Sequence, residues 1–406
     1  MSKWQEVPLR TIYQRVEVRG RPDLPLLSVY RDHGVVPRDE RDDNNNRPSE
    51  DLSTYKHVRP GDLVVNKMKT WQGSLAVSGH EGIVSPAYFV GRRIADVDNR
   101  FMHHLLRSSP LIAEYGARSK GIRPSQWDLP WDEFASIKVA LPTTTDQRTI
   151  ADYLDTETTR IDALIEKKKR MIELLFDRRR MLVMAAVTGS SMGAGIPNPR
   201  SVRHRGWWSG QVTDGWRIGR LKDLVEVDNG YPFDSTRFND VAGTPVIRIR
   251  DLLRGYTETF FDGPIPSAAL VHDGDLLIGM DGDFNSVVWS GGRAALNQRL
   301  CRLRAKPELD QQFLRYLVDL PLRYINDLTY ATTVKHLSSS DLLQEKIPLP
   351  PLSIQYEIGV SIAIQTARID KLIDALRRQL KRFLDRRHAL ITFAVTGELE
   401  IPEMAA

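Results

Sequence analysis

Several short motifs contain residue types that could do chemistry, but each lacks a part that its chemistry requires. His80-Glu81 begins a zinc-protease pattern, yet position 84 is valine, so the second histidine ligand is missing. Ser85-Pro-Ala-Tyr88 is similar to the Ser/Asn/Asp-Pro-Pro-Tyr/Phe motif of amino-methyltransferases, but its third residue differs and no glycine-rich cofactor loop precedes it. The sequence has no Gly-Lys pair and therefore no phosphate-binding loop. These failures favour a recognition protein over an enzyme.

A second class of residues, cationic and amide side chains interleaved with aromatic ones, is typical of DNA recognition. Arginine pairs bidentately with guanine edges, and asparagine or glutamine pairs with adenine edges. The candidates in the first half of the chain are Lys67, Lys69, Trp71, Arg92, Arg118, Lys120 and Arg123. The candidates in the second half are Arg237, Arg248, Arg250, Asn285, Asn297, Arg299, Lys335 and His336. Any single one of them is also a common type of surface residue, which is the alternative interpretation.

The composition is that of an ordinary globular protein. The chain has 406 residues, 41% of them hydrophobic and 27% charged, which predicts two or three domains and excludes disorder as the main state. No apolar stretch approaches the roughly 20 residues that a membrane span needs, so we expect no membrane partner. Cys301 is the only cysteine, which excludes internal disulfides and multi-cysteine metal sites and fits a cytoplasmic protein. The net charge of +5 is compatible with a polyanion partner without establishing one.

A long internal repeat organises the sequence. Residues 141–189 match residues 349–397 position by position without a gap, and both copies end in Ala-Val-Thr-Gly. Weaker matches extend upstream, where Trp4 corresponds to Trp216. The predicted organisation is a first domain over 1–140, a helix over 141–189, a linker over 190–215, a second domain over 216–348, a helix over 349–397 and a tail over 398–406.

Each matched segment is predicted to form one long helix. No proline or glycine occurs from Thr143 to Thr188, and a glycine follows each segment where a C-terminal cap belongs. Apolar residues recur every seven positions, a spacing that favours packing of one helix on another. We therefore expect the two helices to pair in antiparallel fashion about a pseudo-two-fold axis, with a globular domain at each end of the rod. The alternative is that each helix packs only on its own domain.

The two globular parts are rich in short strand patterns. The segments 62–67, 82–84, 244–250 and 275–279 are short and rich in β-branched residues, and turn signals such as Asp228-Asn-Gly230 separate them. The predicted fold class is therefore mixed α/β (α+β): two similar globular domains separated by two long antiparallel coiled-coil helices with pseudo-two-fold symmetry.

In its duplicated helix segments and its two globular parts, the chain resembles the DNA-specificity subunits of type I restriction-modification systems. The resemblance covers nearly the whole length, and its most specific part is the duplicated signature. That signature consists of Leu-Pro, then Gln147 or Gln355, then Arg-Ile-Asp-x-Leu-Ile, Asp-Arg-Arg and Ala-Val-Thr-Gly. The family usually has glutamate before the glutamine, whereas this chain has Asp146 and Ile354.

The resemblance implies a function that agrees with the pattern of the residues. The globular parts would be target-recognition domains that each bind one half of a split, asymmetric double-stranded DNA target, and the helices would fix the gap. Such a subunit has no activity and no cofactor of its own. It recruits two methyltransferase subunits, which bind S-adenosylmethionine, and two restriction/translocase subunits that use ATP and Mg²⁺. The helices are the expected docking surface, through Gln147, Arg160, Asp162, Gln355, Arg368 and Asp370.

Two other functions stay open at this stage. One is a self-contained adenine methyltransferase, supported only by Ser85-Pro-Ala-Tyr88. The other is a coiled-coil scaffold whose basic helix faces bind acidic proteins rather than DNA.

Overall fold

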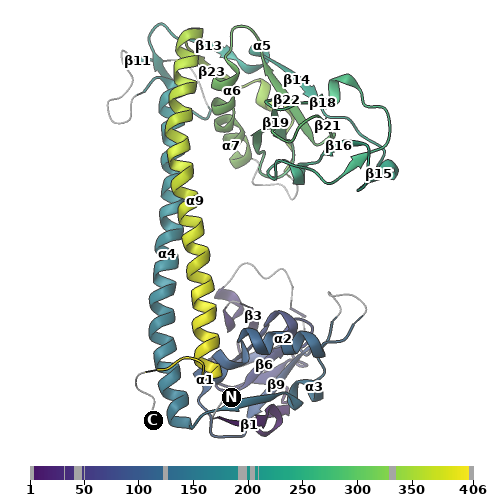
Figure 1. The fold of residues 1–406 in the computed structure, drawn as a ribbon, viewed down its shortest axis with the longest axis vertical. Coiled ribbons are helices and arrows are strands. Elements are labelled where there is room, and N and C mark those ends of the chain that lie inside the picture. Colours follow the sequence, from purple (N-terminus) through teal and green to yellow (C-terminus); the bar gives the residue numbers. More distant parts are fainter. Residues whose placement is uncertain are drawn as a thin grey trace. The chain divides into compact units, whose positions relative to one another are not determined.

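The computed structural model describes most of the chain (Figure 1). The described residues are 4–31, 33–40, 48–49, 51–121, 127–190, 199–201, 206–208, 210–328 and 335–401. The predicted DNA contact Arg123 lies outside them. The chain divides into two compact units, Met1–Lys169 with Arg377–Ala406 and Arg170–Leu376. The division falls within both long helices, so each unit contains a globular domain and a half of each helix.

The first unit is built around an antiparallel four-stranded sheet of order β2-β9-β6-β7. Shorter pairs β3-β4, β5-β8 and β1-β10 surround this sheet. The strands are β1 (Gln5–Pro8), β2 (Tyr13–Val16), β3 (Leu27–Tyr30), β4 (Gly34–Pro37), β5 (Lys56–Val58), β6 (Leu63–Asn66), β7 (Leu75–Val77), β8 (Gly82–Val84), β9 (Tyr88–Arg93) and β10 (Lys138–Leu141). The short helices are η1 (Leu9–Thr11), η2 (Arg38–Glu40), η3 (Thr70–Gln72), α1 (Asn99–Leu106), α2 (Ser109–Arg118) and α3 (Trp131–Ser136).

The second unit repeats this plan with an additional sheet. Its four-stranded sheet has the order β14-β22-β19-β20, and a five-stranded sheet has the order β15-β17-β16-β21-β18. The strands are β11 (Pro199–Ser201), β12 (Gln211–Thr213), β13 (Arg217–Arg220), β14 (Val225–Asn229), β15 (Phe238–Asn239), β16 (Thr244–Ile247), β17 (Phe260–Phe261), β18 (Leu270–Val271), β19 (Leu276–Gly279), β20 (Ser286–Val288), β21 (Ala294–Leu296), β22 (Leu300–Ala305) and β23 (Lys346–Leu349). The short helices are α5 (Leu221–Leu224), η5 (Ser235–Arg237), η6 (Ile249–Asp251), η7 (Ser267–Ala269), α6 (Gln311–Leu317), α7 (Asp319–Leu328) and α8 (Ser339–Leu343).

The predicted strands lie close to the observed ones, with one difference. The segment 244–250 was expected to be a single strand, but β16 ends at Ile247 and the chain turns into η6. The side chain of Asp251 causes the turn, because its carboxylate accepts a hydrogen bond from the backbone N–H of Arg248 at 3.1 Å. This local capping competes with strand extension.

The two matched segments form single helices of equal length, α4 (Thr144–Thr188) and α9 (Leu352–Thr396). Each has 45 residues and is therefore roughly 70 Å long. Both end at a glycine with positive φ, 79° at Gly189 and 78° at Gly397, as a left-handed C-cap requires. Within the described residues, no helix is both long and apolar enough to cross a bilayer.

The helices pair in antiparallel fashion within each unit, as predicted. In the first unit, Ile150 and Leu154 near the start of α4 share a buried cluster with Ala394 and Val395 near the end of α9. In the second unit, the end of α4 packs with the first half of α9, and Val187 lies in the same core as Ile362 and Ile369. Each domain core is thus completed by the end of the helix that belongs to the other copy of the repeat.

Part of the predicted linker belongs to the core of the second unit. Trp207, Trp208 and Val212 are buried there, and the Trp208 indole N–H donates to the carbonyl of Lys346 at 3.1 Å. The Gly, Ser and Pro content of residues 190–215 predicted a linker, but the two tryptophans supply enough apolar surface to hold this segment on the domain.

Candidate nucleic-acid interface

Three loops of the second unit meet at one end of its four-stranded sheet. They are the β19–β20 turn, the β21–β22 turn and the segment 335–337. The backbone N–H of Met280 donates to the carbonyl of Arg299 at 2.9 Å, and the N–H of Leu337 donates to the carbonyl of Met280 at 2.7 Å. The N–H of Gly282 donates to the carbonyl of Lys335 at 3.2 Å. Main-chain bonds therefore hold together several candidate residues that lie far apart in the sequence.

The carboxylate of Asp281 lies between the side chains of His336 and Arg299 at this junction. One oxygen is 2.7 Å from Nδ1 of His336 and the other is 3.2 Å from a guanidinium nitrogen of Arg299. The side chains of His336 and Arg299 are 53% and 54% exposed, so much of each remains open to a ligand. Arginine has five N–H donors, and one carboxylate occupies only some of them. Both side chains are thus held by Asp281 and remain half exposed.

An exposed aromatic side chain borders this cluster. Tyr231 donates its N–H to Leu296 at 2.8 Å and accepts from the N–H of Gln298 at 3.1 Å. Gly230 permits this approach, because a Cβ there would lie 1.9 Å from the carbonyl oxygen of Asn297. The ring is accessible for stacking on a base, which is a common element of nucleic-acid binding. Sequence reasoning placed Asn297 and Arg299 among the candidates but missed Tyr231, whose only signal is its place in Gly-Tyr-Pro-Phe.

The remaining candidates of the second unit are spread over other segments. The guanidinium of Arg237 lies 5.1 Å from the centre of the Phe261 ring, a cation–π contact. The guanidinium of Arg248 bonds Asp251 and Thr259 within the fold, whereas Arg250 is exposed. Asn285 lies in the β19–β20 turn, and its backbone carbonyl accepts from the N–H of Gly279. The ammonium of Lys335 donates to the side chain of Asn326 at 2.6 Å.

The first unit has a similar junction at the same end of its sheet. The N–H of Leu129 donates to the carbonyl of Lys67 at 3.1 Å, as Leu337 does to Met280 in the second unit. The ammonium of Lys67 is 3.0 Å from the carboxylate of Asp128. Two aromatic rings, Trp71 and Trp127, meet edge to face with their centres 5.2 Å apart. The structure thus brings Lys67 and Trp71 together.

Two further candidates surround this junction. Lys69 is exposed and precedes η3. Lys120 forms a main-chain bridge with Asp128, and its ammonium is 3.1 Å from Glu133. Their positions add positive charge beside the two tryptophans.

Two predicted contacts of the first unit form ion pairs within the fold. Both oxygens of Asp62 accept from the guanidinium of Arg92, at 3.1 and 3.0 Å, and Asp62 is buried. Arg118 donates to Glu114 at 2.7 Å and to Ser136 at 2.9 Å. A buried arginine–carboxylate pair stabilises the sheet that carries it, so we assign Arg92 to the domain's stability rather than to base recognition.

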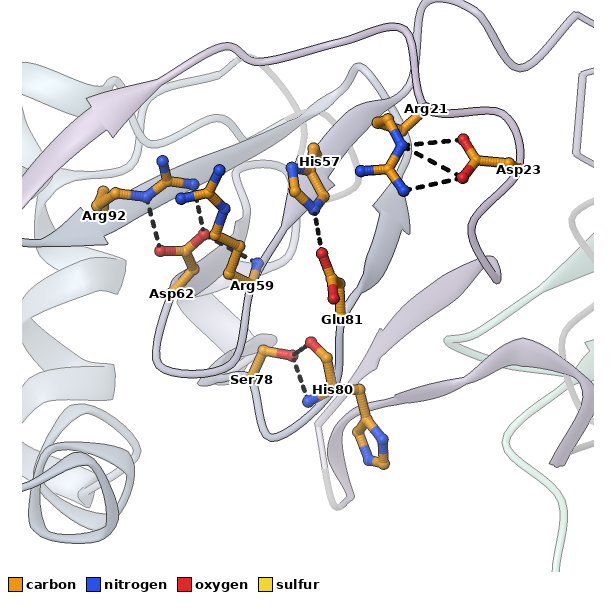
Figure 2. A network of polar contacts seen from close by, with 9 residues as sticks. All are labelled: Arg21, Asp23, His57, Arg59, Asp62, Ser78, His80, Glu81 and Arg92. Carbon is orange, nitrogen blue, oxygen red and sulfur yellow. Dashed lines mark hydrogen bonds and ion pairs between the residues drawn. The ribbon is translucent and has the colours of Figure 1, made fainter.

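A polar network around His57 and Glu81 in the first unit accounts for the protease-like motif (Figure 2). Glu81 does not face a second metal ligand. Its carboxylate lies 2.9 Å from Nε2 of the buried His57, which comes from β5. The described residues contain no group of three His, Cys, Asp or Glu side chains placed to hold a metal ion. Ser85 to Tyr88 form a turn that leads into β9, because the N–H of Tyr88 donates to the carbonyl of Ser85 at 3.0 Å.

The helix signature forms two reciprocal ion pairs. In the first unit, Asp162 of α4 is 2.8 Å from the guanidinium of Arg387 of α9. In the second unit, Asp370 of α9 is 3.2 Å from that of Arg179 of α4. Asp162 matches Asp370 and Arg179 matches Arg387 in the repeat, so equivalent residues form an ion pair once in each unit. The pair in the first unit is also hydrogen-bonded through Nε of Arg387, whereas Nε of Arg179 has no hydrogen-bond partner among the described residues. Two motifs that are separate in the sequence therefore bind each other across the copies.

The other predicted docking residues divide into two groups. Arg160 and Arg368 are exposed on the helices, where a partner could reach them. Gln147 and Gln355 are only 2% and 1% exposed. A side chain that is buried within its own domain cannot form a docking surface, so this assignment of the two glutamines is corrected. Their polarity suggested the surface, but their partners are backbone groups of the domain.

Comparisons with known proteins agree with this architecture. A family model described as the type I restriction modification DNA specificity domain matches residues 213–382. The chain is 37% identical over 193 residues to the specificity subunit of the Escherichia coli type I restriction enzyme EcoBI, a match covering 46% of this chain and 40% of that protein. It is 22% identical over 384 residues to the type I restriction enzyme MjaVIII specificity subunit of Methanocaldococcus jannaschii, covering 87% and 84%.

A solved structure supports the same relationship at the level of the fold. It comes from work described as the structural basis underlying complex assembly and conformational transition of the type I R-M system. The two chains have a TM-score of 0.64 and 16% identity, and the match covers 98% of each. The chain thus carries the specificity domain in its second half and matches such subunits in sequence and fold along most of its length. It is therefore similar to the specificity subunits of type I restriction-modification systems, and it spans less than half the length of the EcoBI subunit that it matches at 37% identity.

Proposed function

We propose that this chain recognises a bipartite, asymmetric double-stranded DNA target for a type I restriction-modification complex, and that it has no catalytic activity of its own. The observation that carries the proposal is the duplicated unit. Each copy has a sheet whose loops present cationic and aromatic side chains, and a long helix that binds the helix of the other copy through Asp162–Arg387 or Asp370–Arg179. The loops of the two units differ in sequence, so the two half-sites should differ as well.

The partners of the proposed complex are enzymes that carry the cofactors. Two methyltransferase subunits would bind S-adenosylmethionine and flip the target adenine out of the duplex. Two restriction/translocase subunits would supply ATP- and Mg²⁺-dependent activity. The exposed faces of α4 and α9, including Arg160 and Arg368, are the proposed docking surface, and the cytoplasm is the proposed compartment.

The function is tested by selection of DNA from a random library. The chain, purified with methyltransferase subunits of the same host, is mixed with random duplexes several helical turns long, and the retained duplexes are sequenced. We expect one enriched motif with two unlike halves and a fixed gap, and methylation only when the methyltransferase subunits are present. Methylation or cleavage by the chain alone, or the absence of any enriched motif, would contradict the proposal.

The alternative of a self-contained methyltransferase makes a separate prediction. S-adenosylmethionine should then bind the isolated chain in calorimetry, whereas we expect no heat of binding. If the chain is instead a scaffold that binds acidic proteins, its charges do not contact DNA, and the DNA affinity of the complex should not depend on them. A steep fall of affinity with salt in the assembled complex would argue against it.

The helices are proposed to act as the ruler between the half-sites. Four residues inserted near Lys168 lengthen α4 by roughly 6 Å. The preferred gap between the half-sites should then lengthen. An unchanged gap would mean that the helices do not set the distance.

A further inference from the structure

The two buried glutamines of the helix signature share two equivalent hydrogen bonds, one made in each unit by Oε1 and one by Nε2. Gln147 lies in the first turn of α4. Its Oε1 accepts from the backbone N–H of Asp98 at 2.9 Å, and its Nε2 donates to the carbonyl of Pro142 at 3.0 Å. Both bonds stay within the first unit, and they join the beginning of α4 to the strand before it and to the beginning of α1.

Gln355 repeats this arrangement in the first turn of α9. Its Oε1 accepts from the backbone N–H of Asp310 at 2.8 Å, and its Nε2 donates to the carbonyl of Pro350 at 2.8 Å and that of Glu308 at 3.1 Å. A contact that occurs in both copies, although the surrounding domains differ in sequence, is a feature of the repeat rather than an accident of one domain.

The residue whose backbone N–H donates to each glutamine is the N-cap of a short helix. Asp98 and Asp310 are the N-cap residues of α1 and α6, and their carboxylates accept from backbone N–H groups of the first turn. In a capping box, a Glu or Gln at the third helical position accepts from the N–H of the N-cap residue. That position holds Phe101 in α1 and Phe313 in α6, which cannot accept. The long helix therefore supplies the missing half of each box.

The chemistry of the side chain explains why both copies use glutamine. An amide accepts with its oxygen and donates with its nitrogen, so one side chain satisfies an N–H and a carbonyl at once. A glutamate carboxylate could accept from Asp98 or Asp310 but could not donate to the proline carbonyl. A methionine of similar size would leave both buried backbone groups without partners, which is costly.

The hydrogen bonds of Gln147 and Gln355, called the glutamine clamp from here on, connect each long helix to the four-stranded sheet of its unit, called the recognition sheet. Strand β9 lies between β2 and β6 and leads within a few residues to Asp98, and β22 leads likewise to Asp310. A second bond supports the glutamine clamp in the second unit, where Nε2 of Gln312 donates to the carbonyl of Gly359 of α9 at 3.3 Å. In the first unit, Arg100 of α1 is 2.8 Å from both Asp152 and Asp155 of α4.

We propose that Gln147 and Gln355 are positioning residues that fix the direction of each long helix relative to the recognition sheet of its own unit. They thereby hold the two half-sites at a single gap length. This inference rests on the proposed function, because it assumes that the chain binds a split DNA target.

The test uses the complex with methyltransferase subunits and the same selection from random duplexes. Gln355→Met should leave the bases of both half-sites unchanged but broaden the distribution of gap lengths. The fraction of retained duplexes with other gaps should rise about fivefold, the change in population that corresponds to one net hydrogen bond. The matched control is Gln365→Met on the same helix. Gln365 is exposed, donates to Ser361 at 3.0 Å, and should give the wild-type distribution.

Gln355→Glu adds a readout that simple loss of stability would not produce. At neutral pH its carboxylate faces the carbonyls of Pro350 and Glu308, and the gap distribution should be broad. Burial favours the protonated acid, which can donate like the amide, so mild acid should narrow the distribution again. The other titratable groups at this position are the carboxyl of Asp310, which caps α6, and that of Glu308, which pairs with Arg217. The gap distribution of the wild-type complex, measured at the same two pH values, shows how much of any change comes from the titration of these two carboxyls.

The outcomes separate the inference from the proposed function. If the wild-type complex selects no split motif, the proposed function fails and the inference fails with it. If wild type selects a fixed gap and both Gln355→Met and Gln355→Glu keep that gap at neutral pH, the inference alone is overturned. Should Gln355→Met not fold, Gln355→Glu and Gln147→Glu at the two pH values decide the matter, because acid-dependent narrowing requires a folded protein. A change in half-site bases rather than in the gap would also contradict the proposal.

Discussion

The reciprocal ion pairs give the sharpest test of how the two helices bind each other. Asp162→Arg places two cationic side chains opposite each other in the first unit, and Arg387→Asp places two carboxylates there. The double variant Asp162→Arg, Arg387→Asp restores an ion pair with the charges exchanged. If the helices pair in antiparallel fashion as the structure shows, each single change should destabilise the protein and the double change should recover most of the loss.

The magnitude follows from the exposure of the side chains. Asp162 and Arg387 are 49% and 30% exposed, so solvent screens the pair and the full energy of a buried ion pair does not apply. Exposed pairs of this kind couple by about 0.2–1 kcal/mol. The 2.8 Å distance and the contact through the guanidinium nitrogen favour the upper part of that range. The pair Asp370–Arg179 has similar exposure and a distance of 3.2 Å, so a somewhat smaller coupling is expected.

Urea unfolding of wild type, the two single variants and the double variant gives the coupling energy as a double-mutant cycle. The control cycle uses Asp177 and Arg180, an intrahelical pair of α4 at 3.1 Å that does not depend on the other helix. Addition of salt should weaken both couplings. Strictly additive effects at Asp162 and Arg387, with no recovery in the exchanged pair, would refute the pairing.

Three further predictions concern other parts of the chain. Burial lowers the pKa of His103 to about 3 from 6.5, so the unfolded chain binds the proton first as pH falls. Stability should then decline by up to about 1.4 kcal/mol per pH unit below 6.5, and urea unfolding of His103→Gln should lack this slope. Gly397→Ala should lower the free energy of unfolding by about 1–2 kcal/mol, since φ is +78° and a Cβ would lie 3.0 Å from the Trp4 ring; an unchanged melting curve would contradict this. The basic face of α9 includes the exposed residues Arg378, Arg382 and Arg386. If this face binds DNA phosphates, replacing the three arginines by glutamine should reduce the slope of log affinity against log salt concentration by roughly 0.9 per lost contact. A slope equal to that of wild type would exclude phosphate contacts by this face.

The sequence predicted the elements that repetition and periodicity encode. The helix boundaries and the C-cap glycines follow from local rules that were applied twice, once to each copy. The antiparallel pairing follows from the seven-residue apolar spacing that the two equal helices share. The pairing partners of Asp162 and Asp370 were not predictable, because an ion pair between two copies depends on the register of two helices. The Arg-Ile-Asp and Asp-Arg-Arg blocks are visible in each copy of the repeat. Nothing in the sequence of one copy indicates that its Arg-Ile-Asp block contacts the Asp-Arg-Arg block of the other copy.

The candidate site was predicted less completely, and for a physical reason. Residue type alone cannot distinguish an arginine that is paired within the fold, such as Arg92, from one that is half exposed, such as Arg299. The polar character of Gln147 suggested a surface, whereas its partners are backbone groups brought close by the fold. Tyr231 carries no charge, and its only signal in the sequence is its place in Gly-Tyr-Pro-Phe. Its position follows from the glycine before it, which allows the approach of the β21–β22 turn.

The central claim is that two unlike recognition domains, each fixed to a shared pair of helices, select one split DNA target. The most direct measurement is a genome-wide map of methylated adenines in the host with the gene intact, with the gene deleted, and with residues 216–348 exchanged for those of a relative. We expect one bipartite motif to disappear on deletion, and the exchange to change one half of the motif while the other half and the gap remain. A methylation map that is the same in all three strains, or an exchange that alters both halves, would contradict the account.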